Sequence, residues 1–415
     1  MERLPGFRDF YPEPLPHSDV WSADARQFIF GRWRETARRY GFREYDGPPL
    51  EPLELFTTKS GDEIVGQLYN FTDKGERAVA LRPEMTPTLA RMVAAHERNY
   101  KKPVKWFAIP QLFRYERQQK GRLREHFQFN ADLIGETSPA ADAELIALLI
   151  DTLRSFGLTG KDFVIRLSSR NAWQEFYQHG RRKAEGGNGE YEFFQVIDKL
   201  ERTPPEESEK KLAALGFTLE TVNQFIKSGK PTVELQGILD NLAARGLREF
   251  VKVDYHVVRG LAYYTGVVFE AFDAKGEFRA IAGGGRYDNL VKLVSGGRVD
   301  LSALGFGMGD VVLLELLKAR GLLPKFDATT DVFVLIEDEN LRPQSLKLVQ
   351  DLRAAGYAVE YPLTPVKPDK QFKRAQELKV AHTARLENDA YVRIRNLKDR
   401  KEIMAGVAGA AHHLG

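Results

Sequence analysis

The sequence of 415 residues contains no cysteine. This absence excludes disulfide bridges, thiolate metal sites and a cysteine nucleophile, and it is typical of proteins in a reducing cytosol. No stretch approaches the roughly 20 apolar residues of a membrane span. The start, MERLPGFRDFYPEP, has charges and prolines where a signal peptide has its apolar segment. We therefore expect a cytoplasmic protein that does not enter the membrane.

A large excess of one charge is also missing. The 61 basic and 58 acidic residues leave a formal net charge of only +3, so a polyanionic partner must be bound by local basic patches. The chain is too long for one typical hydrophobic core, and we expect two or three domains.

The sequence instead contains a mixture of helix and strand patterns. Apolar spacing predicts helices over 18–40 and 139–157. A proline-containing extended segment follows the first helix, a hairpin turns at Gly75, and a further helix begins at Thr86 or Pro87. Strands are predicted over 104–116, 123–135, 254–273 and 278–291.

Two regions differ from this pattern. Residues from about 171 to 250 have helical periodicity throughout and predict a helical insertion into the sheet. After a polar, proline-containing stretch at 321–330, strands and helices alternate, which predicts a separate small α/β domain of about 85 residues.

Five basic residues lie close together between two apolar segments of the sequence. Arg114, Arg117, Lys120, Arg122 and Arg124 occupy eleven positions. A solvated loop, a groove for nucleic acid and a phosphate site would each explain such a cluster.

The strand after this cluster has an apolar face and a polar face. Its period of two places Arg124, His126, Gln128, Asn130 and Asp132 on the same side. A solvated sheet face is the common explanation, but cation, imidazole, amide and carboxylate together are unlike an ordinary wet face. We therefore interpret this face as a candidate ligand surface.

Arg114 and Glu116 share a face of the preceding strand and extend this surface, unless they form only a surface ion pair. Arginine suits a phosphate held in bidentate geometry. Glu84 and Thr86 lie at alternate positions before a helix. Helix capping would explain Thr86, but it does not explain Glu84, which is a candidate acceptor for a cationic or imidazole ligand.

Two later segments interrupt strand patterns with polar residues. Arg259 precedes Tyr263 and Tyr264. This polar interruption is a candidate for a functional site, and an edge strand with aromatic packing is the alternative explanation. Residues 283–285 are glycines before Arg286, where a ligand or another backbone could approach closely. No HExxH motif occurs, and several arginines with amides and carboxylates fit phosphoryl or nucleotidyl transfer.

Taken together, these motifs resemble the histidyl-tRNA synthetases, a class II aminoacyl-tRNA synthetase family. The long helix and the proline-containing strand resemble motif 1, which forms the dimer interface. FRYERQQKGRLREHFQ resembles motif 2, and RGLAYYTG and GGGRYD are similar to two histidine-specific signatures. The resemblance implies an α+β fold with a six-stranded antiparallel catalytic sheet over residues 1–325, with the helical insertion, and an anticodon-binding α/β domain over residues 326–415.

The resemblance also implies a reaction, its partners and its residues. ATP, with Mg²⁺, would activate L-histidine for transfer to tRNA(His) in a homodimer, and Arg114 and Arg259 would be catalytic. The implied histidine-binding residues are Glu84, Thr86, Arg114, Gln128, Asp132, Arg259, Tyr263 and Tyr264. The implied ATP-binding residues are Arg114, Glu116, Arg122, His126, Gly285 and Arg286, and no protein side-chain metal site is implied.

The chain departs from the family pattern where ATP would bind. Val311 and Val312 stand where most members have the glutamate and arginine of motif 3. His126 stands where most members have an aromatic ring that covers the adenine, and Ala262 replaces an aspartate. Organellar and related bacterial members share such variants, which argues against decay. The rival is the histidine-sensing regulatory subunit of ATP phosphoribosyltransferase, and a third alternative is an RNA-binding protein without catalysis.

A last group of basic residues lies in the predicted C-terminal domain. Lys367, Lys370, Lys373 and Arg374 cluster around a predicted helix. They are candidates for contacts with phosphates of the tRNA anticodon stem, and an ordinary solvated helix is the alternative.

Overall fold

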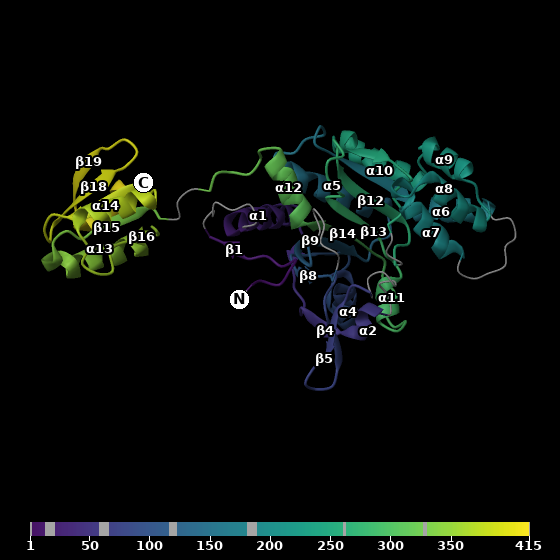
Figure 1. Cartoon of the computed structure of the whole chain (residues 1–415), viewed down its shortest axis with the longest axis horizontal. Coiled ribbons are helices and arrows are strands. Elements are labelled where there is room, and N and C mark those ends of the chain that lie inside the picture. The colour runs from purple at the N-terminus through teal and green to yellow at the C-terminus, as the bar shows by residue number, and fades with distance from the viewer. Residues whose placement is uncertain are drawn as a thin grey trace. The chain divides into compact units, whose positions relative to one another are not determined.

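The computed structural model describes residues 2–12, 21–57, 66–115, 123–180, 189–259, 263–326 and 330–414. The chain forms two compact units, Met1–Leu323 and Pro324–Gly415. Each is described by itself, and Figure 1 labels the elements of both.

The N-terminal unit is built on one large sheet (Figure 1). Its centre consists of six antiparallel strands in the order β10-β12-β13-β14-β9-β7, which confirms the expected six-stranded sheet. The strands are β7 (Val104–Ala108), β9 (Glu125–Ile134), β10 (Phe163–Ser169), β12 (Val267–Asp273), β13 (Ala282–Arg286) and β14 (Ala303–Gly309).

Further strands extend this sheet at its margins. β11 (Val251–Val253) pairs in parallel with β10, β3 (Arg43–Glu44) pairs in parallel with β7, and β8 (Gln111–Phe113) pairs with the start of β9. The predicted strand 104–116 is thus two strands, because Ile109 and Pro110 interrupt it, and proline lacks the N–H that a ladder needs.

Helices bury the apolar face of the sheet. α1 (Ala23–Arg39) and α5 (Pro139–Arg154) contribute to the same hydrophobic core as Phe129 and Leu133 of β9. Ser22 caps α1 by accepting a hydrogen bond from the Ala25 N–H at 3.2 Å. The residues of β9 that the two-residue period assigns to the core are therefore in it, and the polar residues face away from these helices.

A smaller sheet, β4-β6-β5, adjoins the large one. β5 (Tyr69–Thr72) and β6 (Ala78–Leu81) form the predicted hairpin, and β4 (Leu50–Pro52) pairs with β6. α2 (Leu53–Thr57) and α11 (Leu290–Val294) are short. α4 (Thr86–His96) follows β6, and its N-cap residue is Met85 and not Thr86, so the capping explanation was wrong.

The predicted strand 254–273 was also wrong in its first half. Regular pairing begins only at Val267, because Arg259 adopts a left-handed φ of +62° that no strand allows. Tyr263 and Tyr264 therefore do not alternate across a sheet, and both are buried.

Residues 170–250 are helical in the part that the structure describes. The elements are α6 (Arg170–Gly180), α7 (Gly189–Asp198), α8 (Pro205–Ala214), α9 (Leu219–Ser228) and α10 (Val233–Ala244), with short 3-10 turns η2 (Leu200–Arg202) and η3 (Arg248–Phe250). α6 to α9 pack around Trp173 and Phe193, while α10 packs on α5.

The C-terminal unit has a mixed sheet in the order β16-β15-β17-β18-β19. Its elements are β15 (Val332–Leu335), α13 (Arg342–Ala354), β16 (Val359–Glu360), α14 (Pro368–Glu377), β17 (His382–Leu386), β18 (Tyr391–Asn396) and β19 (Glu402–Gly406). The sequence did not predict β19. In the chain regions described, no helix is long and apolar enough to cross a membrane.

Candidate active site

The polar face of β9 meets a row of glycines on β14. The register places Gln128, Asn130 and Asp132 against β14. A side chain at Gly305 would overlap Asp132, and one at Gly307 would overlap Gln128. The glycines therefore leave room for the polar side chains of β9. Asn130 and Asp132 are each 5% exposed or less. This face is therefore buried at Asn130 and Asp132 and partly exposed at His126 and Gln128.

One cavity brings together all eight residues predicted to bind histidine. It is lined by Glu84, Thr86, Arg114, Gln128, Asp132, Arg259, Tyr263 and Tyr264. They come from the start of α4, from the β8 and β9 region and from the segment before β12. Separated motifs thus meet at one surface of the sheet.

Glu84 and Tyr263 form one side of this cavity. The Tyr263 hydroxyl donates to Glu84 Oε2 at 2.6 Å, and both residues are buried. Burial and the neighbouring Glu84 carboxylate raise the pKa of Tyr263 well above its usual value. The hydroxyl therefore stays protonated and holds one carboxylate oxygen in place.

Asp132 and Tyr287 form a second buried pair. The Tyr287 hydroxyl donates to Asp132 Oδ1 at 2.5 Å. Burial raises the pKa of Asp132 to about 7, although the Tyr287 hydrogen bond opposes this shift. Tyr287 also lines the cavity, and sequence reasoning missed it although it follows Arg286 in the GGGRYD segment.

Arg259 lies against Gly283 and pairs with Glu270. The pair is close, and a side chain at Gly283 would overlap the Arg259 guanidinium. Burial opposes its charge, but Tyr264 and Glu270 outweigh burial and raise the pKa of Arg259. Among the described residues, Arg259 Nε is buried and has no hydrogen-bond partner. A fixed cation with a spare donor can bind an anion.

Arg114 also lines the cavity. Its Nε donates to the Pro83 carbonyl at 2.9 Å, which ties it to the segment that carries Glu84. With Arg259 it gives the cavity two guanidinium groups, while Glu84 and Asp132 supply two carboxylates. Such a site can bind a zwitterion with an additional phosphate group.

His126 lies beside this cavity and not in its lining. Burial, followed by the charges of Arg114 and Arg8, lowers the pKa of His126 to about 3. The imidazole is therefore neutral at physiological pH and can act as a flat, uncharged ring.

Two residues predicted to bind ATP have packing roles in the structure. Arg286 is buried, donates to Asp142 Oδ2 through Nε at 3.0 Å, and donates to the Ser138 carbonyl through Nη2 at 2.9 Å. A side chain at Gly285 would clash with the Val267 carbonyl and with Val268. Arg286 points to the start of α5 and Gly285 allows close strand packing, so neither reaches the cavity lining.

Other predicted positions lie outside the described residues. These are Glu116 and Arg122 of the ATP set, with Arg117, Lys120 and Ala262. Arg124 is described, and its guanidinium stacks on Tyr115 with 4.2 Å between Cζ and the ring centroid.

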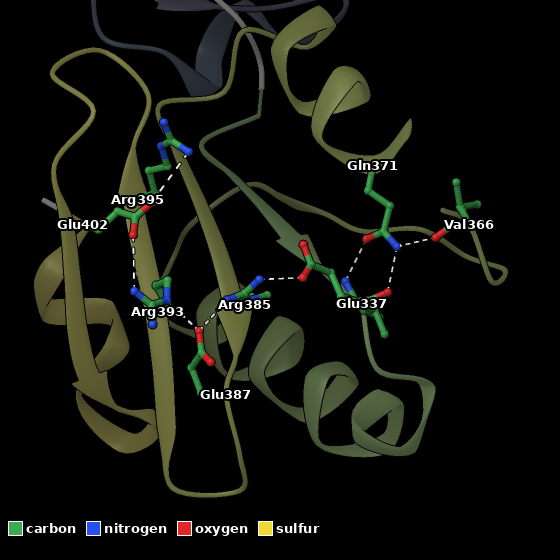
Figure 2. Close-up of polar contacts among 9 residues, drawn as sticks. Glu337, Val366, Gln371, Arg385, Glu387, Arg393, Arg395 and Glu402 are labelled. Atoms are coloured by element: carbon green, nitrogen blue, oxygen red, sulfur yellow. Dashed lines mark hydrogen bonds and ion pairs between the residues drawn. The ribbon is translucent and has the colours of Figure 1, made fainter. Parts of the chain in front are cut away.

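The C-terminal unit carries a second candidate site on its sheet. Figure 2 shows Arg385, Arg393 and Arg395 side by side, held by glutamates. Arg393 donates to Glu387 at 2.6 Å and to Glu402 at 3.3 Å. The three arginines and Glu402, with Phe372 and Lys373 of α14, line a groove of about 610 Å³.

The basic residues of α14 lie partly at this groove. Lys367, Lys370, Lys373 and Arg374 are all exposed, and Lys373 alone of the four lines the groove. The Gln371 side chain anchors the helix by donating to the carbonyls of Ile336 and Val366 at 2.7 Å each (Figure 2). The sequence singled out the helix but missed the arginines of the sheet.

Two family profiles match the chain over both units. One, described as Histidyl-tRNA synthetase, matches residues 18–309, and the other, described as Anticodon binding domain, matches residues 331–411.

Individual relatives match nearly the whole length. A protein of Opitutus terrae named histidine–tRNA ligase is 49% identical over 404 residues, which covers 91% of this chain and 88% of that protein. The chloroplastic/mitochondrial histidine–tRNA ligase of Arabidopsis thaliana is 39% identical over 389 residues, covering 89% and 77%. The crystal structure of a histidyl-tRNA synthetase from Nostoc sp. PCC 7120 has the same fold, with a TM-score of 0.75 at 22% identity over 97% of each chain.

Proposed function

The chain belongs to the histidyl-tRNA synthetase family, and on this premise we propose how its residues bind and activate histidine. It is an ATP-dependent histidine–tRNA ligase. The regulatory-subunit alternative is not favoured, because relatives matched over most of the chain are ligases and residues 331–411 match an anticodon-binding domain. The observation that carries our assignment of residues is the convergence of eight predicted side chains on one cavity.

Histidine is bound through its two polar ends. Glu84, held by the Tyr263 hydroxyl, accepts a hydrogen bond from the imidazole together with Tyr264. Asp132 and Gln128 bind the α-ammonium group, with Thr86 at the side of the pocket. Because each acceptor is buried and already oriented, a ligand lacking the matching donor leaves it unpaired, which disfavours that ligand.

Activation joins the histidine carboxylate to the α-phosphate of ATP. A carboxylate oxygen attacks the α-phosphorus in line, the bond to the bridging oxygen breaks, and pyrophosphate leaves. Arg114 positions carboxylate and phosphate together, and Arg259 stabilises the charge that develops on the phosphate oxygens. A terminal ribose hydroxyl of the tRNA then attacks the acyl carbon, and AMP leaves.

The nucleotide lies beside the histidine pocket. We assign the adenine to the surface formed by the neutral His126 ring, which is suited to stacking. The assignment of Glu116 and Arg122 to ATP rests on the family resemblance alone. Arg286 and Gly285 are assigned to packing.

Magnesium would arrive with the nucleotide. The described residues contain no group of three His, Asp or Glu side chains arranged for a metal ion. Mg²⁺ in such enzymes is held largely by substrate phosphates and water, and it would neutralise phosphate charge there.

We also propose the wider context. The groove between α14 and the arginines of the C-terminal sheet contacts tRNA(His), since cations and an aromatic ring bind single-stranded nucleic acid. A homodimer is proposed from the motif 1 resemblance of α1 and β4, and a cytoplasmic location from the absence of cysteine in the sequence.

Pyrophosphate exchange tests the proposed function. Purified protein should catalyse histidine-dependent exchange of labelled pyrophosphate into ATP and should charge a tRNA(His) transcript. Histidine binding without exchange and without charging would contradict it and support the regulatory alternative. Light scattering of the same sample tests the dimer.

A further inference from the structure

A buried arginine from the N-terminal segment lies next to the nucleotide side of the site. Arg8 Nε donates to Glu125 Oε1 at 2.6 Å, and Nη1 donates to Asp310 Oδ2 at 2.8 Å. The side chains of Arg8 and Glu125 are 1% exposed and that of Asp310 is 6% exposed. One guanidinium therefore joins β9 to the first residue of α12 (Asp310–Ala319).

Each member of this cluster has further contacts. The Glu125 Oε2 atom also accepts from Gln111 Nε2 at 2.9 Å, and Asp310 Oδ1 accepts from the Phe127 backbone N–H at 3.0 Å. Trp21 stacks on the guanidinium, with 4.5 Å between Cζ and the ring centroid. The Gly6 carbonyl accepts from the Arg124 N–H at 3.0 Å, so the N-terminal segment is anchored to the same strand.

The cluster holds the backbone of β9 on both sides of His126. Glu125 and Phe127, its chain neighbours, are each bonded into the cluster, and the His126 ring lies next to Gly309, which precedes Asp310. The family's motif 3 cation is missing from α12, where Val311 and Val312 stand. Arg8 brings a cation to the same helix start from a different part of the chain.

We propose that Arg8 is a positioning residue for ATP: through Glu125 and Asp310 it fixes the His126 ring and the start of α12, in place of the missing motif 3 arginine. Arg8 does not touch ATP, because two carboxylates and an aromatic ring enclose it. This inference rests on the proposed function, in which His126 adjoins the adenine. Its consequence is that the N-terminal segment determines nucleotide affinity.

The test separates ATP binding from folding. Arg8→Met should raise the KM for ATP in pyrophosphate exchange by about tenfold to a hundredfold, as expected for a small displacement of a binding surface, and should leave the KM for histidine within about twofold. Arg8→Lys should be intermediate, because one ammonium cannot reproduce the fork that contacts both carboxylates. Arg3→Met is the matched control, since Arg3 pairs with Asp9 at the surface of the same segment.

A double variant keeps the test decisive if Arg8→Met folds poorly. Arg8→Met with Asp310→Leu removes one of the two carboxylates left without their cation, so the melting temperature should recover in part while the KM for ATP stays high. An unchanged KM for ATP in a folded variant, or equal increases for ATP and histidine, would overturn the positioning role. If the wild-type protein shows no exchange, the proposed function fails and this inference fails with it.

Discussion

The two units of the molecule use arginine in opposite ways. In the N-terminal unit the side chains of Arg8 and Arg286 are 1% and 4% exposed. Arg8 contacts two carboxylates, and Arg286 contacts the Asp142 carboxylate and backbone carbonyls. In the C-terminal unit the side chains of Arg385, Arg393 and Arg395 are 34%, 39% and 37% exposed, although they too pair with glutamates. The arginines of both units pair with carboxylates, but the exposed fraction of their side chains differs.

Exposure decides what such a pair contributes. A buried pair cannot be broken without leaving an uncompensated charge, so it fixes the backbone segments that it joins. A half-exposed pair is screened by water and contributes little to stability, so its arginine can exchange the carboxylate for a phosphate. We therefore expect the buried arginines to control folding and site geometry, and the exposed ones to control RNA binding.

The largest expected effect is on Arg286. Arg286→Met leaves Asp142 buried without its cation and should lower the free energy of unfolding by about 3–5 kcal/mol. Urea denaturation followed by tryptophan fluorescence measures it, because all four tryptophans, Trp21, Trp33, Trp106 and Trp173, lie in the N-terminal unit.

Two further variants test whether burial is the cause. Arg77→Met, which breaks a pair whose arginine side chain is 78% exposed, should leave the urea midpoint unchanged. Arg286→Met with Asp142→Leu removes both charges and should recover most of the loss. A loss of stability in Arg286→Met no larger than that in Arg77→Met would show that burial does not separate the two kinds of arginine.

The next largest effect is on Arg259. Its side chain is 23% exposed, which lies between the buried and the half-exposed arginines. Arg259→His should slow pyrophosphate exchange by about 10²–10³-fold, as for loss of one donor that stabilises developing charge, while histidine affinity changes much less. Exchange kinetics and calorimetric titration with histidine provide the two values. Equal losses in both would assign Arg259 to substrate binding alone.

Sequence reasoning succeeded where a local pattern carries the information. The period of two in β9 placed Gln128 and Asp132 correctly because the sheet is regular there. It failed at residues 254–259 and 263–266, which form no strand; Arg259 has a left-handed φ there, and no single-residue propensity signals it. Partners far apart in sequence were also beyond reach: Asp142 for Arg286 and Tyr287 for Asp132 depend on how strands and helices pack.

The carboxylates of the two units also differ in burial, and this difference predicts a pH dependence of histidine binding. Burial raises the pKa of Asp132 to about 7, whereas Arg393 and Arg385 lower the pKa of the half-exposed Glu387. Because the folded pKa of Asp132 exceeds its unfolded value, ionising it costs stability as pH rises from about 4 to about 7. Ionised Asp132 is the form that binds an ammonium group, so histidine affinity of the free enzyme should rise up to about tenfold per pH unit below 7.

The Asp132→Asn variant isolates this effect. The histidine ligand titrates in the same range, but its own titration is common to both proteins. The ratio of wild-type to variant dissociation constants, measured by titration between pH 5.5 and 8.5, should therefore follow the ionisation of Asp132. A ratio that does not vary with pH would assign the ammonium group to another acceptor.

The smallest expected effect is on the exposed arginines, and it is the sharpest contrast with Arg286. Arg393→Gln should weaken tRNA(His) binding by about 1 kcal/mol, roughly fivefold, and should reduce the salt dependence of binding because one phosphate contact is lost. Pyrophosphate exchange, which needs no tRNA, should be unchanged. Lys347→Gln is the control, since Lys347 pairs with Asp351 on α13 and does not line the groove. If Arg393→Gln unfolds the C-terminal unit instead, its pairs with Glu387 and Glu402 are structural, and half-exposure does not make an arginine available to RNA.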